Sequence, residues 1–97
     1  MAYKLVFSNV YKVKYQKIIK RNANLRGKII KVHELLSIDP QNPALKSHKV
    51  NAINFGLAWS SSVTGDIRII WNYDEQNKLV ILILTIGSHS GSSKVYK

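Results

Sequence analysis

The spacing of apolar residues changes about halfway along the chain, and this change limits what the chain can fold into. In the first half, apolar residues recur every three to four positions, the spacing of one helix face: Leu25, Ile29, Val32 and Leu36. Over residues 67–73, apolar and polar residues largely alternate, as in a strand with one buried face. Helices followed by strands are typical of the α+β class, in which the helices lie together on one side of a sheet.

The other segments complete the order β-α-α-β-β-β. Residues 3–7 predict a first strand, and Ser8 or Asn9 is a suitable N-cap for a helix that breaks at residues 22–24. Asn24 can cap the second helix, which Asp39-Pro40 ends. After it, residues 48–52 begin a candidate strand, and strands are expected at residues 57–63, 67–73 and 78–87, the last in the centre of the sheet because both its faces are apolar. We therefore predict one domain, residues 1–97, with an antiparallel sheet of about four strands and an αα-hairpin packed on one face.

The charge of the chain is strongly positive and unevenly distributed. The net charge is +10, and residues 1–33 contain nine Lys or Arg but no Asp or Glu. Such a surface attracts the phosphate backbone of a nucleic acid, and it equally attracts an acidic protein. We expect RNA to be the polyanion, and we expect these basic residues to contact it: Lys12, Lys14, Lys17, Lys20, Arg21, Lys46, Lys49 and Lys94.

Several classes of protein are disfavoured by the composition. The chain has no Cys, so it uses neither disulfides nor thiolates. Its longest apolar run, residues 79–84, is far shorter than a membrane span, and its N-terminal apolar run is too short for a signal peptide. We therefore expect a cytoplasmic protein that does not insert into a membrane.

The three histidines do not have the spacing of a metal site. His33, His48 and His89 are 15 and 41 positions apart, and no Gly-rich phosphate-binding motif is present. We therefore predict no metal and no cofactor, with His33 structural or solvent-facing inside its helix. Metal-free acid–base chemistry is still open to such a chain. In RNA the 2′-hydroxyl attacks its own phosphate, so the protein only has to move two protons and neutralise charge. DNA lacks this hydroxyl.

Five short motifs follow one another in the second half of the chain: Leu45–Val50, Ala58–Ser60, Gly65–Trp71, Ile86–His89 and Val95-Tyr96. Their order resembles the RelE/ParE toxin superfamily, and most closely its YafQ/RelE-type mRNA interferases. The first half is similar in order and spacing, so the resemblance covers nearly the whole chain. It implies the toxin of a type II toxin–antitoxin system. Such a toxin cuts mRNA on the ribosome without metal, inhibits translation, and is silenced by a cognate antitoxin protein.

The resemblance also implies a role for each residue that matches a family motif. His89 would be the general acid, and His48 a general base or a phosphate contact. Asp66 would orient or assist proton transfer, and Arg68 would stabilise charge on the phosphate. Tyr96 would stack on, or position, a base of the mRNA.

Two segments depart from the family pattern. Ser60-Ser61-Ser62 stands where relatives frequently carry Arg or His, and residues 90–94 lengthen the segment between His89 and Tyr96. The loss of one donor that stabilises the transition state reduces a rate by about 10²–10³, although Lys94 could replace it. Two alternatives therefore stay open: a weak or inactive homologue that acts only by binding, and a ParE-like inhibitor of gyrase. The signatures of plain RNA-binding modules are absent.

Overall fold

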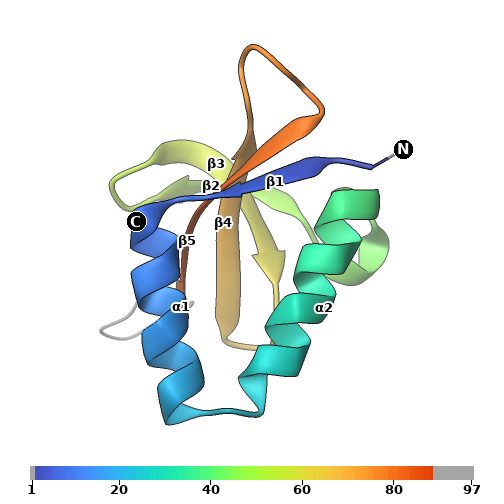
Figure 1. The fold of residues 1–97 in the computed structure, drawn as a ribbon. Coiled ribbons are helices and arrows are strands. Elements are labelled where there is room, and N and C mark those ends of the chain that lie inside the picture. The colour runs from blue at the N-terminus through green and yellow to red at the C-terminus, as the bar shows by residue number, and fades with distance from the viewer. Residues whose placement is uncertain (1, 89–97) are drawn as a thin grey trace.

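Two helices are inserted between the first strand and the remaining strands in a computed structural model, which describes residues 2–88 (Figure 1). The elements are β1 (Lys4–Phe7), α1 (Asn9–Arg21), α2 (Leu25–Ile38), the short 3₁₀ helix η1 (Pro43–Leu45), β2 (His48–Ala52), β3 (Gly56–Ser62), β4 (Ile67–Tyr73) and β5 (Val80–Ser88). The α+β class and the αα-hairpin are confirmed. Within the described residues, neither helix combines the length and the apolar character needed to cross a membrane.

The sheet has the strand order β1-β5-β4-β3-β2. Neighbouring strands from β2 to β5 are antiparallel, as expected of a meander, and β5 has a partner on each side. The sheet differs from the predicted antiparallel sheet of about four strands in two ways. Four strands rather than three follow the helices among the described residues, which makes five strands with β1. The sheet is also mixed, because β1 pairs in parallel with β5. This pairing joins the two ends of the described chain, so nothing in the local sequence of β1 indicates it. The intervening helices and strands form the long crossover that a parallel pair requires.

The start of α1 is fixed to the sheet by Ser8. Its hydroxyl oxygen accepts a hydrogen bond from the Tyr11 amide at 3.0 Å and donates one to the Leu84 carbonyl at 2.6 Å. The predicted N-cap is therefore confirmed, and it also connects the helix to β5. The predicted cap of α2 is wrong in its detail. The Asn24 side chain makes no capping hydrogen bond, and instead the Asn22 side chain accepts one from the Asn24 amide at 3.2 Å.

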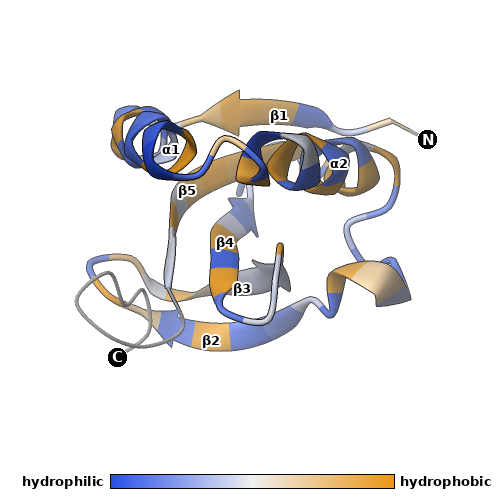
Figure 2. Cartoon of the chain, turned by 90° about the horizontal axis from the view of Figure 1, so that it is seen from below, coloured by the Kyte–Doolittle hydropathy of each residue, from blue (hydrophilic) through white to orange (hydrophobic). Residues whose placement is uncertain are grey.

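Both helices cover the β1–β5 side of the sheet, and β2 and β3 lie beyond them (Figure 2). The main core lies between the helices and the sheet, and its buried members are Tyr11, Ile29, Val32, Leu36, Leu45, Ile69, Trp71, Ile81, Ile83 and Ile86. A second, smaller cluster around Ala52, Ala58 and Ile70 lies on the opposite face. Neighbouring residues of β4 therefore belong to different cores, as the alternation of a strand requires.

His33 is part of the core between β1 and the two helices. Its Nε2 lies 2.6 Å from the Tyr11 hydroxyl, and its ring packs against Phe7 and Tyr15. Burial lowers the pKa of His33. Burial, together with the nearby Tyr15, raises the pKa of Tyr11. Both groups therefore stay neutral at neutral pH and share one hydrogen bond, and of the two expectations for His33 the structural one is confirmed.

We predict that the free energy of unfolding decreases as the pH falls below about 6.5, the ordinary pKa of His. The folded state holds His33 neutral, so below this pH the unfolded state binds a proton that the folded state takes up only at lower pH. The contribution of His33 to the free energy of unfolding is complete above its ordinary pKa. It is lost as the pH falls toward the lowered pKa of the folded state. Urea unfolding at pH 7.5 and pH 5.5 measures it, and His33→Gln should show a smaller difference. Equal differences in the two proteins would contradict this role of His33.

Candidate active site

The start of β2, the end of β3, the start of β4 and the end of β5 lie at one end of the sheet. His48 pairs with Ser60, and two residues further along β3, Ser62 pairs with Arg68. Cross-strand partners share a face, so His48 and Arg68 both lie on the face away from the helices. Strand spacing places their Cα atoms about 10 Å apart across the sheet and about 7 Å apart along it.

The imidazole of His48 is exposed and held in one orientation by the backbone. Its Nδ1 lies 3.0 Å from the carbonyl oxygen of Lys46, which ends η1 in the left-handed conformation with φ of 52°. A carbonyl can only accept, so Nδ1 carries the proton of this hydrogen bond. In the neutral ring Nε2 is then unprotonated and can accept a proton. His48 thus has the tautomer of a general base.

Asp66 lies in the turn before β4 and contacts the end of β5. The Ser88 hydroxyl is 2.8 Å from one carboxylate oxygen and 2.9 Å from the other. The Thr64 hydroxyl oxygen accepts the amide hydrogens of Asp66 and Ile67 and so shapes the turn. Strand alternation predicts a common face for Asp66 and Arg68, but it does not apply here because β4 begins after Asp66. The contact with Ser88, which the sequence did not indicate, places this carboxylate.

Arg68 is partly buried, and its guanidinium is fixed at one nitrogen. Nη1 donates to the Thr64 carbonyl at 2.6 Å and to the Ile67 carbonyl at 3.3 Å. Within residues 2–88, Nε and Nη2 keep their N–H donors for another acceptor. The side chain therefore presents a positive charge with oriented donors at the sheet end, as a phosphate contact requires.

The middle residue of the three consecutive serines of β3, Ser61, has a structural role that the sequence did not reveal. Ser60 and Ser61 are fully buried. Ser61 Oγ accepts a hydrogen bond from Trp71 Nε1 at 2.7 Å and lies 2.7 Å from Ser47 Oγ, which donates to the Pro40 carbonyl at 2.8 Å. Since the Ser47 proton is used on Pro40, Ser61 donates to Ser47. This relay ties the loop before His48 to the centre of the sheet, and a charged side chain at position 61 would be buried beside Trp71.

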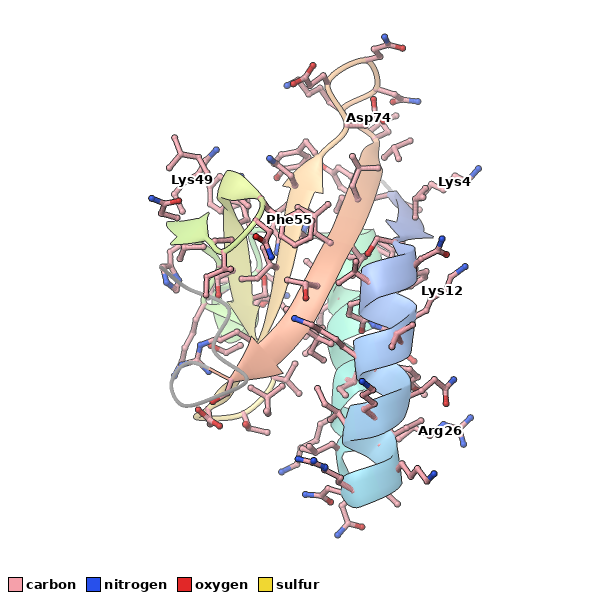
Figure 3. The ribbon with its side chains drawn as sticks, turned by 90° about the vertical axis from the view of Figure 1, so that its left-hand side faces the viewer. Lys4, Lys12, Arg26, Lys49, Phe55 and Asp74 are labelled. Carbon is pink, nitrogen blue, oxygen red and sulfur yellow. The ribbon has the colours of Figure 1, made fainter. Side chains whose placement is uncertain are left out.

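The other predicted site residues are distributed over several surfaces. His89, Lys94 and Tyr96 lie outside the described residues, and their roles stay predictions. The remaining basic residues are all exposed: Lys12, Lys14, Lys17, Lys20 and Arg21 on α1, Lys46 at the end of η1, and Lys49 on β2. Lys49 lies on the face opposite His48, far from Lys12 and Arg26 on the helices (Figure 3). Residues 2–88 contain no group of three His, Asp or Glu side chains that could hold a metal ion.

The fold is that of known toxins, although the sequence matches no protein-family model and no curated protein. The toxin in the E. coli DinJ–YafQ toxin–antitoxin complex matches with a TM-score of 0.69 at 15% identity, over 92% of this chain and 94% of that one. The archaeal RelE–RelB complex from Pyrococcus horikoshii matches with 0.68 at 16% identity, over 95% and 100%. YoeB from Staphylococcus aureus matches with 0.62 at 18% identity, over 88% and 94%.

We predict that Ser61→Ala lowers the free energy of unfolding by about 1–3 kcal/mol, because it leaves the buried Trp71 N–H without an acceptor. Ser62→Ala is the matched control, since Ser62 is less buried, and it should change the value by less than about 0.5 kcal/mol. Urea unfolding of the two variants beside the wild-type protein measures the difference. Equal losses of stability would mean that the relay is not specific to Ser61.

Proposed function

Because the chain has the RelE/ParE toxin fold, we propose that it is the toxin of a type II toxin–antitoxin system. In this proposal it is a metal-independent endoribonuclease that cuts mRNA on the ribosome and so inhibits translation in the cytoplasm. The observation that carries the proposal is the sheet register, which brings His48 and Arg68 to one end of the sheet. Asp66 contacts Ser88 at the same end, from which the sequence continues to His89.

Proton transfer in this reaction is divided between two histidines. His48 Nε2 takes the proton from the 2′-hydroxyl of the RNA as that oxygen attacks the adjacent phosphate. The Lys46 carbonyl supports this step because it holds Nδ1–H and favours the imidazolium that forms. His89 gives a proton to the 5′-oxygen as the P–O bond breaks. The products are a 2′,3′-cyclic phosphate and a 5′-hydroxyl, so no water and no metal-bound hydroxide is needed.

Charge and position are provided by the other residues. Arg68 donates to the phosphate oxygens as negative charge builds up on them, and its anchor on the turn carbonyls keeps it oriented. Asp66, which contacts Ser88 at the end of β5, assists the proton transfer. Tyr96 stacks on an mRNA base. The basic residues of α1, with Lys46, Lys49 and Lys94, contact the phosphates of ribosomal RNA and mRNA.

The expected protein partner is a cognate antitoxin. The solved complexes of YafQ with DinJ and of RelE with RelB are similar in fold to this chain. Nine Lys and Arg residues without a single Asp or Glu among residues 1–33 favour an acidic partner segment on the helices. Such a segment competes with RNA for the same positive charge.

A binding-only toxin is the second candidate, and two observations favour it. Serine side chains carry no charge, so the end of β3 contributes no cation at positions 60 and 61, and both side chains are fully buried. Arg68 already uses Nη1 on two backbone carbonyls. A protein of this kind would stop translation by occupying the ribosome, and it would leave the mRNA intact.

We predict that induction of the protein stops growth and produces new mRNA 5′ ends inside reading frames. His89→Ala should reduce their formation by about 10²–10⁴, the usual contribution of a general acid, and His48→Gln should also reduce it strongly. Glu75→Gln, on the exposed hairpin at the other end of the sheet, is the control and should cut like the wild-type protein. Equal growth arrest by the wild-type protein and His89→Ala would refute the acid role. Arrest with intact mRNA would indicate the binding-only toxin.

A further inference from the structure

Within the described residues, the two helices cover only part of one face of the sheet, and an aromatic side chain lies where this cover ends. α1 packs on β5, and α2 packs on β1 and η1, so β2 and β3 lie beyond both helices (Figure 2). Trp59 of β3 pairs with Trp71 of β4 and with Lys49 of β2. These three side chains therefore form one row on this face. Its inner member, Trp71, is fully buried, Trp59 is partly exposed and Lys49 is exposed.

The indole of Trp59 is held rigidly from behind. It stacks on Trp71 with ring centroids 5.6 Å apart and planes 14° apart. Tyr73 meets both rings edge-on at 83°, and Ser61 holds Trp71 by its indole nitrogen. A flat ring fixed in this way loses little conformational entropy when a second flat group stacks on it, which favours binding.

The outer side of the row is occupied by the Lys49 side chain. Its Nζ lies 5.2 Å from the centroid of Trp59. A cation on an exposed ring changes an equilibrium about twofold to fivefold, whereas a nucleic-acid base stacked on an aromatic side chain changes it about fivefold to a hundredfold. A base can therefore displace Lys49 from the ring. The released ammonium group can then bind a phosphate next to that base.

The position of this row relates it to the candidate active site. Among residues 2–88, β2 is an edge strand, and its neighbouring residues His48 and Lys49 point to opposite faces. A single strand of RNA that passes round this edge reaches His48 on one face and Trp59 on the other. With a net charge of +10, the chain attracts such a strand.

We propose that Trp59 and Lys49 form a second site for single-stranded RNA, in which a base stacks on the Trp59 indole and Lys49 binds an adjacent phosphate. The inference shares its ligand, RNA, with the proposed function, but it does not require that the RNA be cut. A flat, pre-stacked indole beside a lysine favours a base over an acidic peptide, and the peptide is a separate arm of the test.

The test uses the intrinsic fluorescence of the two tryptophans. Of the two tryptophans, Trp71 is fully buried, so quenching by a base that stacks directly on an indole reports on Trp59. A short 2′-O-methyl oligoribonucleotide, which cannot be cut by 2′-hydroxyl attack, should quench the emission saturably, and duplex RNA should not. Trp59→Phe should remove the quenching and keep the affinity within about threefold, whereas Trp59→Leu should weaken binding about tenfold in fluorescence anisotropy. Lys49→Met should reduce the slope of log affinity against log salt by about 0.7.

Several outcomes would overturn the site. The first is binding of the oligonucleotide without quenching, and the second is equal affinity of Trp59→Leu and the wild-type protein. A third is quenching by an acidic peptide such as oligoglutamate but not by RNA, which would make this face a protein interface. If Trp59→Leu fails to fold by circular dichroism, Trp59→Phe and Lys49→Met decide the question. Cleavage by the wild-type protein and its loss in His89→Ala are scored separately, so the proposed function can stand when this site fails.

Discussion

The Trp71 indole donates a buried hydrogen bond to the Ser61 hydroxyl, and this bond helps to fix the alignment of β3 with β4. A slip of one residue between these strands would exchange their faces, moving Trp71 out of the main core and Arg68 into it. Apolar packing favours the observed register, and the buried N–H makes it specific, since in that register the Trp71 indole meets the Ser61 hydroxyl. Through Ser47, the same bond also holds the chain just before His48. Core, candidate site and the Trp59 surface therefore depend on one alignment.

Two of the five acidic residues lie at the end of the sheet opposite the candidate site. The turn between α1 and α2 lies toward the same end of the molecule as the start of β4, and the β4–β5 hairpin with Asp74 and Glu75 lies at the other end (Figure 1). Arg68 and the basic residues next to the α1–α2 turn thus lie toward one end of the molecule and these two carboxylates lie at the other, whereas Asp66 lies in the turn before β4. Such polarity orients a charged molecule before contact, because the field acts over about one Debye length, roughly 8 Å at physiological salt.

Much of the fold could be predicted from the sequence, because the signals for it are local. The helical spacing of apolar residues predicts both helices, with Ser8 at the start of the first and Asp39-Pro40 at the end of the second. The alternation in β4 and the apolar residues on both faces of β5 predict the order of the meander. The parallel pairing of β1 with β5 has no local signature. The candidate site residues His48, Asp66 and Arg68 can be predicted from short motifs, which are local. Their contacts with Lys46, Ser88 and the turn carbonyls depend on how the chain folds around them, which the motifs do not show. The burial of Ser60 and Ser61, and the stacking of Trp59 on Trp71, became visible only in three dimensions.

The central claim is that the RNA supplies its own nucleophile and the sheet end supplies proton transfer and charge. It is tested most directly with a defined mRNA on purified ribosomes, compared with the same mRNA carrying one 2′-deoxy nucleotide at the position that is cut. The account predicts that the unmodified mRNA yields a 2′,3′-cyclic phosphate and a 5′-hydroxyl, and that the deoxy mRNA stays intact at that position. Cleavage of the deoxy mRNA there, or a product that begins with a 5′-phosphate, would contradict it.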